Sequence, residues 1–137
     1  MTLQARLRER IADGKLLVAP GIYDGLTAKL AAGVGFEALY MTGYGTSASR
    51  RGLPDIGLLT MTEMLDNVRA IADAVEVPLI ADADTGYGNP VNVVRTVTES
   101  ERAGAAAIHI EDQVWPKRCG FFAGKKVVPP AEMVARV

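Results

Sequence analysis

The chain has 137 residues, of which 49% are hydrophobic and 23% charged, the balance of an ordinary globular domain with a buried core. A formal net charge of −1 gives no electrostatic reason to expect a nucleic acid or an anionic membrane as a partner, and no apolar run reaches the roughly 18 residues that a membrane span needs. A single cysteine, Cys119, excludes an internal disulfide, so we expect a soluble, cytoplasmic protein.

Helix and strand signals alternate along the chain. Apolar residues at helical spacing, with caps such as Asp24 and Thr60 or Thr62 before them, predict helices at 3–12, 25–32, 60–75 and 90–103, and another from Pro130. Short apolar runs predict buried strands at 16–19, 38–42, 79–83 and 106–110. The segment after the second strand, rich in Gly, Ser and Arg, is expected to be a long loop.

This alternation predicts an α/β fold of parallel βαβ units. Polar residues and glycines follow every predicted strand, as they do at the C-terminal rim of a (β/α)8 TIM barrel, where active sites lie. A doubly wound open sheet is the alternative, but that fold gathers its ligand loops at one switch point. Because a complete barrel takes about 250 residues, we expect residues 1–137 to be the N-terminal half of a single barrel domain, with its first four strands.

The third predicted strand ends in two carboxylates, Asp82 and Asp84. Side chains on a strand alternate between faces, so both are expected on the same face, about 7 Å apart. Two like charges at the end of a buried strand are costly, and a divalent cation removes that cost; Mg2+ is often held by one or two carboxylates. The alternative is that both aspartates are solvated loop residues or cap the helix after Pro90.

The loops together resemble those of the isocitrate lyase and phosphoenolpyruvate mutase superfamily. Five motifs at strand ends carry the resemblance: Thr42-Gly-Tyr-Gly45, Gly52-Leu-Pro-Asp-Ile-Gly57, Asp82-Ala-Asp-Thr-Gly-Tyr-Gly88, His109-Ile-Glu-Asp-Gln113 and Lys117-Arg-Cys-Gly120. The resemblance implies a TIM barrel, a tetramer that exchanges a C-terminal helix, and Mg2+-dependent making or breaking of C–C or P–C bonds in small 2-oxo or 2-hydroxy acids.

The resemblance also implies roles for the metal residues. Asp82 and Asp84 would hold Mg2+, with Mn2+ as a possible substitute, directly or through water. Glu111 and Asp55 would form its second shell and orient a bound water. On the sequence alone, Asp55 reads equally well as a turn residue after Pro54.

A substrate carboxylate is expected to meet the backbone N–H groups of Thr42, Gly43 and Tyr44, because successive amides form an anion nest. The segment 86–88 is expected to be structural, and His109, the only histidine, a core residue with satisfied hydrogen bonds.

Cys119 and Gly120 complete the expected substrate-binding set. A lone cysteine is usually an inert, buried hydrophobe, but Cys119 follows two cationic residues, which favour the thiolate. In the lyase branch of the superfamily, the matching cysteine is the proton donor or acceptor. Phe121 stands where the lyase motif usually has histidine, which puts that role in doubt.

These observations favour a Mg2+-dependent lyase that cleaves a small 2-hydroxy di- or tricarboxylic acid, similar to methylisocitrate or dimethylmalate, into a 2-oxo acid and a carboxylate. Cys119 would protonate the departing enolate-like carboxylate. The alternatives are a carboxyphosphonoenolpyruvate phosphonomutase or oxaloacetate decarboxylase of the same fold, and an inactive half-barrel. The expected partners are the small carboxylic acid and further copies of the chain, as a homotetramer when the protein is complete.

Overall fold

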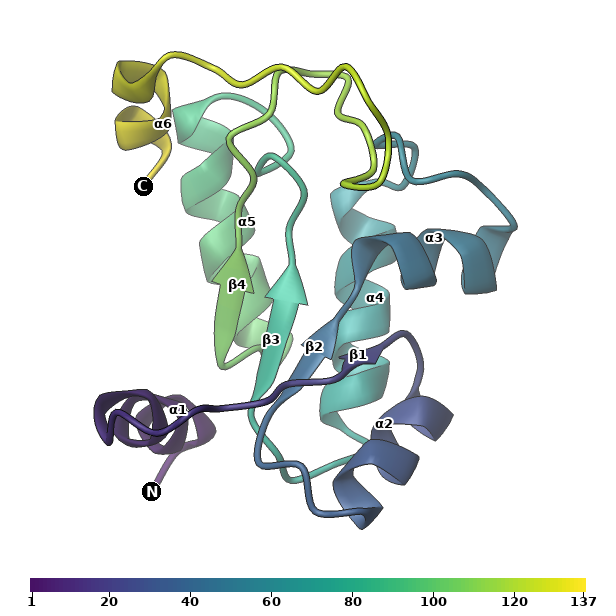
Figure 1. The fold of residues 1–137 in the computed structure, drawn as a ribbon, viewed down its shortest axis with the longest axis vertical. Coiled ribbons are helices and arrows are strands. Elements are labelled where there is room, and N and C mark those ends of the chain that lie inside the picture. Colours follow the sequence, from purple (N-terminus) through teal and green to yellow (C-terminus); the bar gives the residue numbers. More distant parts are fainter.

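A four-stranded parallel sheet forms the centre of the computed structural model, which describes residues 1–137 (Figure 1). The strands pair in sequence order, β1-β2-β3-β4. Their C-terminal ends all point toward the same side of the molecule, where the loop before the last helix crosses above them. The strands are β1 (Gly21–Ile22), β2 (Leu39–Met41), β3 (Leu79–Asp82) and β4 (Ala107–His109).

The chain forms six helices: α1 (Leu3–Ala12), α2 (Gly25–Gly33), α3 (Gly43–Arg51), α4 (Met61–Ala72), α5 (Pro90–Arg102) and α6 (Pro130–Arg136). Three of them begin with a capping box, in which the side chain of Asp24, Thr60 or Asn89 and that of the residue three positions later bond reciprocally to the backbone. The helix starts predicted at Gly25, after the cap Thr60 and at Pro90 are confirmed. They could be predicted because capping depends on residues close together in the sequence. Helix α4 ends at Ala72, three residues before the predicted end.

Two of the predicted elements are wrong. The strand predicted at 16–19 is absent from the structure of these residues, in which sheet pairing begins only at Gly21 and β1 lies at the edge of the sheet. The loop predicted after the second strand contains α3, which is capped by Thr42 and ends at Gly52 in the left-handed conformation. Contacts from elsewhere in the chain hold this glycine-rich helix: Asn67 Nδ2 donates to Thr46 Oγ1 at 3.0 Å.

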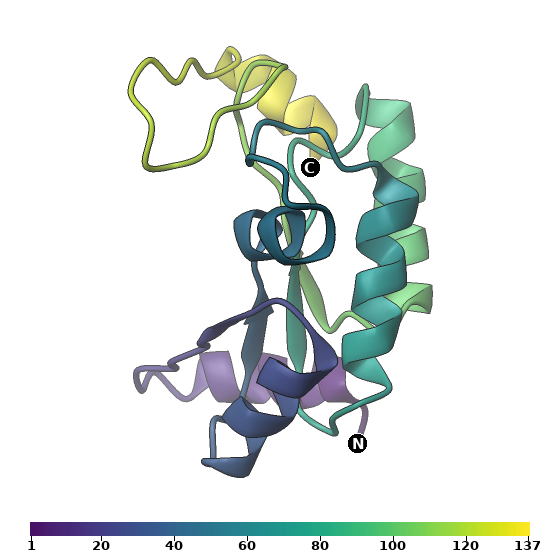
Figure 2. The same ribbon diagram turned by 90° about the vertical axis from the view of Figure 1, so that its right-hand side faces the viewer.

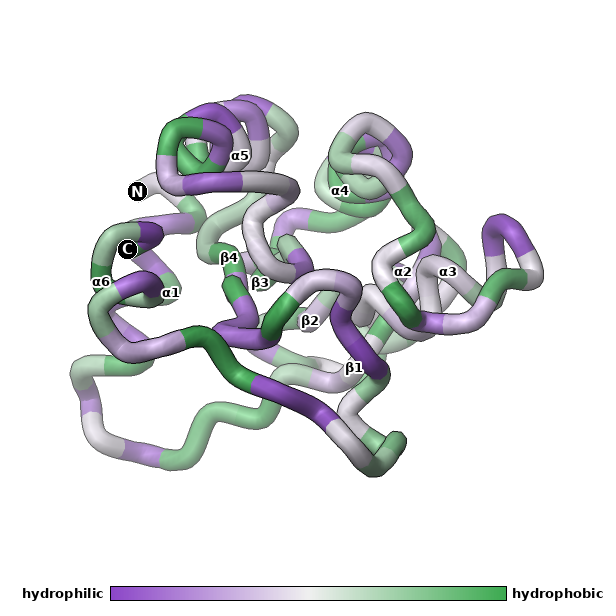
Figure 3. Tube along the Cα trace, turned by 90° about the horizontal axis from the view of Figure 1, so that it is seen from above, coloured by the Kyte–Doolittle hydropathy of each residue, from purple (hydrophilic) through white to green (hydrophobic).

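The hydrophobic core lies between one face of the sheet and the helices. Leu39, Met41 and Leu79 point to this face and are almost fully buried. They pack with α2 and α4, which lie on one side of the sheet with α5 beside α4 (Figure 2, Figure 3). The alternate residues Tyr40 and Ile80 point to the opposite face and are only half-buried. The strands are therefore not equally buried on their two faces.

Truncating a residue of this core is expected to destabilise the fold. Leu39 is 0% exposed, so Leu39→Ala is expected to lower the free energy of unfolding by about 2–5 kcal/mol through lost burial and a residual cavity. The matched change Leu30→Ala, at a leucine that is 62% exposed, is expected to cost no more than about 0.5 kcal/mol. Urea unfolding measures both, and equal losses would contradict this placement of the core.

None of the helices is long and apolar enough to cross a membrane.

Candidate active site

Asp82 and Asp84 meet at the C-terminal end of β3. Strand β3 ends at Asp82, and Asp84 adopts a left-handed conformation with φ 46°, so a turn rather than strand alternation sets their relation. The Asp84 amide donates to Asp82 Oδ1 at 2.9 Å, and both residues are buried. Asp82 Oδ2 accepts from the Gly43 amide at 3.1 Å. The Asp84 and Gly43 amides therefore fix the carboxylate of Asp82, and the turn places the carboxylate of Asp84 beside it.

Lys117 lies at the centre of the cluster. Its ammonium Nζ is 2.6 Å from Asp55 Oδ1, 2.6 Å from Asp84 Oδ1 and 3.5 Å from Glu111 Oε1. The Lys117 side chain is 1% exposed. Three loops, those after α3, β3 and β4, thus meet at one buried cation. We call Asp55, Asp82, Asp84, Glu111 and Lys117 the carboxylate–lysine cluster.

Burial and charge shift the ionisation of the cluster. Burial raises the pKa of Asp84 to about 6, although Lys117 acts to lower it. Burial also raises the pKa of Glu111, again against the effect of Lys117. For Lys117, burial acts to lower the pKa, but the charge of Asp84 and the hydrogen bonds with Asp55 and Asp84 outweigh it, and the net shift is upward. Each ionised group therefore depends on its neighbours to hold its charge.

The cluster fits a divalent cation. It holds four carboxylates and one ammonium, so negative charge is in excess when the acids are ionised. No three acidic, histidine or cysteine side chains lie close enough together to coordinate one ion by themselves. Asp55 and Asp84 pair with Lys117 instead. Mg2+ does not need three such ligands, because it commonly binds one or two carboxylates and keeps several waters. Hard carboxylate oxygens are also the donors that Mg2+ and Mn2+ prefer.

The sequence prediction gave Lys117 no part in the metal site, assigned no role to Tyr40 and took Tyr87 as structural. Tyr40 shares a sheet face with Asp82 and places its hydroxyl 3.1 Å from His109 Nδ1. Burial and the charge of Asp82 raise the pKa of Tyr40. The buried Tyr87 hydroxyl has no hydrogen-bond partner within the protein. The sequence could have indicated that Tyr40 lies on the same sheet face as Asp82, because alternate residues of a strand share a face.

His109 does not belong to the core between the sheet and the helices. Its side chain is exposed on the sheet face away from the helices, where its Nδ1 lies 3.1 Å from the Tyr40 hydroxyl. This is the face that would line the interior of the predicted barrel, so burial of His109 in the complete protein stays a prediction.

The expected substrate amides at Thr42, Gly43 and Tyr44 lie at the start of α3. The Gly43 N–H already donates to Asp82, and the Thr42 hydroxyl accepts from the Gly45 N–H. A Cβ at Gly43 would lie 2.6 Å from Asp82 Oδ2, so this contact requires glycine. Gly43 therefore orients Asp82, and its role in binding substrate stays a prediction, as do those of Thr42 and Tyr44.

Cys119 lies in the loop between β4 and α6 and is buried. The Lys117 ammonium pairs with Asp55 and Asp84, so it is not the cation that the sequence predicted to favour the Cys119 thiolate. Lys125 Nζ donates to the Gly120 carbonyl at 2.6 Å and to the Phe122 carbonyl at 2.8 Å, which folds the loop back over itself. Phe121 is 95% exposed. The roles of Cys119 and Gly120 stay predictions.

Comparison with known proteins places this architecture in a family. The family model described as phosphoenolpyruvate phosphomutase matches residues 7–137. The chain belongs to this family. The 2,3-dimethylmalate lyase of Eubacterium barkeri is 55% identical over 137 residues, which are 100% of this chain and 47% of that protein. The chain thus spans about half the length of this relative.

Solved structures of the superfamily superpose closely. Oxaloacetate acetylhydrolase in complex with the inhibitor 3,3-difluorooxalacetate matches with a TM-score of 0.93 and 48% identity, covering 98% of this chain and 46% of that one. Phosphonopyruvate hydrolase in complex with oxalate and Mg2+ matches with a TM-score of 0.89 and 40% identity, covering 99% and 46%. The predicted α/β fold is confirmed as part of a TIM barrel of the phosphoenolpyruvate mutase and isocitrate lyase superfamily.

Proposed function

We propose that this chain carries the metal-binding part of a Mg2+-dependent carbon–carbon lyase. The substrate would be a small 2-hydroxy or 2-oxo di- or tricarboxylic acid, cleaved to a 2-oxo acid and a carboxylate. The observation that carries the proposal is the carboxylate–lysine cluster at the C-terminal rim of the sheet, where barrel enzymes place their chemistry. The 55% identity to a 2,3-dimethylmalate lyase supports this choice of reaction.

Asp82 and Asp84 would hold the metal, with Asp55 and Glu111 orienting its waters. When bound, Mg2+ supplies a Lewis acid for substrate oxygens on which negative charge develops. The phosphonopyruvate hydrolase relative was solved with oxalate and Mg2+, a small dicarboxylate and the proposed ion. Lys117 keeps Asp55 and Asp84 together, and the Gly43 amide fixes the orientation of Asp82.

The lyase reaction needs a proton at the carbon that leaves as an enolate-like carboxylate. Cys119 is the candidate donor, so Cys119→Ser in the complete protein is expected to lower kcat by about 10²–10⁴-fold, the usual contribution of a proton-transfer group. Because serine is close in size to cysteine, the fold and the KM are expected to change little. A Cys119→Ser enzyme with undiminished kcat would contradict this role and favour the alternative below.

The alternative is a phosphonomutase or an oxaloacetate decarboxylase. Phe121 favours it, because this position departs from the histidine of the lyase motif. The description of the family model as a phosphomutase also favours it. A homotetramer and a cytoplasmic location are further proposals for the complete protein, which gel filtration and cell fractionation test.

A product assay tests the proposed reaction. The complete protein is incubated with 2,3-dimethylmalate, 2-methylisocitrate, isocitrate, oxaloacetate and phosphonopyruvate, with Mg2+ or with EDTA. We expect one of the 2-hydroxy acids to release pyruvate or glyoxylate in the presence of Mg2+ but not in EDTA. Turnover of only oxaloacetate or the phosphonate would select the alternative, and no turnover of any compound would contradict both.

A further inference from the structure

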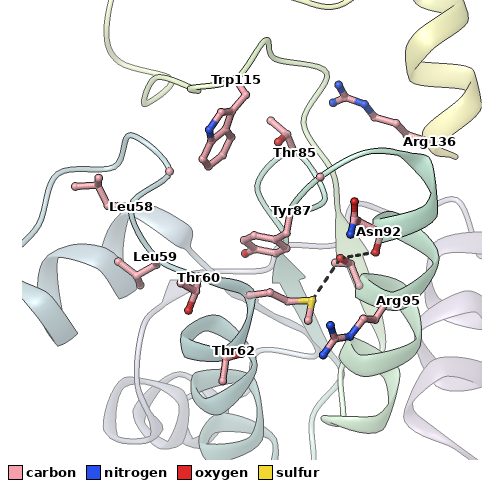
Figure 4. Close-up of a pocket in the computed structure, with 14 residues that line it drawn as sticks. Leu58, Leu59, Thr60, Thr62, Thr85, Tyr87, Asn92, Arg95, Trp115 and Arg136 are labelled. Carbon is pink, nitrogen blue, oxygen red and sulfur yellow. Dashed lines mark hydrogen bonds between the residues drawn. The ribbon is translucent and has the colours of Figure 1, made fainter.

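Trp115 joins two of the loops that meet at the carboxylate–lysine cluster. It lies in the loop after β4, and Figure 4, a view into the neighbouring cavity, shows its indole turned toward the loop that carries Leu58. A Cβ placed on Gly57 would overlap the outer edge of this indole, so the ring lies directly on the Gly57 backbone. Gly57 also has a φ of 76°, in the left-handed region that favours glycine. Only glycine at position 57 permits this contact.

The same two loops are joined a second time by charge. Asp55 lies two residues before Gly57, and Lys117 lies two residues after Trp115. The Lys117 ammonium is 2.6 Å from Asp55 Oδ1. One apolar contact and one ion pair therefore connect the loop after α3 to the loop after β4, side by side.

The loop after α3 offers Trp115 a fixed surface. At its start, the buried Ser47 hydroxyl lies 3.0 Å from the Leu53 carbonyl and 3.2 Å from the Pro54 carbonyl. At its end, Leu59 is buried in the hydrophobic core. Gly57 lies between these two attachments, so the contact positions the loop after β4 rather than its own loop.

Gln113 connects Trp115 mechanically to Lys117. Its buried side chain donates from Nε2 to the Arg118 carbonyl at 2.9 Å and accepts at Oε1 from the Arg118 N–H at 3.0 Å. Nε2 also donates to Glu111 Oε2 at 2.7 Å. The segment from 113 to 118 is thus closed on itself, and a displacement of Trp115 is passed to Lys117.

We propose that Trp115 is a positioning residue for Lys117. With its indole on Gly57, Trp115 holds the Lys117 ammonium at the carboxylates and keeps Cys119, two residues further along, in its buried position. Removing the indole frees this segment without removing a charge or a metal ligand. The effect on catalysis rests on the proposed lyase function, whereas the effect on the positions of Lys117 and Cys119 does not.

The reaction of Cys119 with iodoacetamide reports the position of this segment. Cys119 is 6% exposed, so alkylation requires the segment to open. Mass spectrometry of the peptide that contains Cys119 follows the reaction in the complete, metal-free protein, at a temperature at which each variant is folded. We expect Trp115→Ala to speed alkylation by about tenfold or more. The control Val114→Ala, at the preceding residue, is expected to stay within about twofold of wild type. A role in stability alone would lower the melting temperature without changing the alkylation of the folded protein.

Two glycines of the loop after α3 provide a matched pair. Gly57 and Gly52 have φ values of 76° and 64°, so alanine strains the backbone at both. A Cβ at Gly52 meets no atom within 4 Å, whereas one at Gly57 meets the Trp115 indole. We expect Gly57→Ala to speed alkylation, Gly52→Ala to have little effect, and Gly57→Ala to add nothing in the Trp115→Ala protein.

Three results would overturn the proposal. They are wild-type alkylation rates in Trp115→Ala and Gly57→Ala, an equal effect of Gly52→Ala, and additive effects of Gly57→Ala and Trp115→Ala. If Gly57→Ala does not fold, the comparison of Trp115→Ala with Val114→Ala decides alone.

Activity separates this proposal from that of the lyase. Asp82 and Asp84 lie at the turn after β3, so Mn2+ affinity is not expected to fall in Trp115→Ala. The kcat of the complete protein is expected to fall by about 10–100-fold, because Cys119 is displaced. Faster alkylation with unchanged kcat would overturn the effect on catalysis. A complete wild-type protein without lyase activity would contradict the proposed function, and the alkylation rates would still decide the role of Trp115.

Discussion

Replacing Lys117 by methionine is expected to lower the free energy of unfolding of the metal-free protein by about 3–5 kcal/mol, the usual cost of removing one partner of a buried ion pair. The Lys117 ammonium is 2.6 Å from both Asp55 and Asp84, and its side chain is 1% exposed. Methionine fills similar space but supplies no charge, so the variant buries carboxylates without a counter-ion. Urea unfolding in EDTA measures the loss.

A divalent cation is expected to recover part of that loss. In Lys117→Met the excess negative charge of the cluster is larger, so Mg2+ is expected to raise the melting temperature of the variant more than that of the wild type. The matched control Lys126→Met, at an exposed lysine of the same loop, is expected to change neither quantity. A Lys117→Met protein of wild-type stability, or one indifferent to Mg2+, would contradict the placement of Lys117.

The Asp84→Asn protein is expected to lose activity without losing its fold. Asparagine keeps the shape of the side chain but removes a charged oxygen donor, so we expect Mg2+ affinity and kcat/KM of the complete protein to fall by at least about 100-fold. The loss of stability is expected to be smaller than in Lys117→Met, because Lys117 keeps Asp55 and Glu111 as partners. Burial, which raises the pKa of Asp84 to about 6, also opposes the charge that asparagine removes.

A neighbouring aspartate provides the control. Asp112 is exposed and directly follows Glu111, so Asp112→Asn is expected to leave Mg2+ affinity and kcat/KM within about twofold of wild type. Equal losses in the two variants would show that general charge, rather than the site at Asp84, controls the activity.

Local signals in the sequence were sufficient for most of the fold. Asp24 and Thr60 predicted helix starts because a capping side chain acts within three residues of the chain. Helix α3 was missed because glycines at positions 43 and 45 disfavour a helix, and the contacts that hold it come from Asp82 and Asn67. The strand at 16–19 was predicted from apolar residues alone, although a strand also needs a neighbour to pair with.

The site was predictable only in part. Asp82 and Asp84 lie two residues apart, so their proximity was visible in the sequence, whereas the φ of 46° at Asp84 was not. Lys117 lies far along the chain from Asp84, in a loop, and only the fold brings their charged atoms to 2.6 Å. Four carboxylates at one rim need a cation to balance their charge, and Lys117 meets that need here.

The binding of a divalent cation by the complete protein is the most direct test of this account. Free Mn2+ gives a sharp six-line electron paramagnetic resonance spectrum that broadens when the ion binds, so a titration counts the sites. We predict one Mn2+ site per chain that Mg2+ displaces and that Asp84→Asn abolishes. Failure to bind Mn2+, or unchanged binding in the Asp84→Asn protein, would contradict the assignment of the carboxylate–lysine cluster as the metal site.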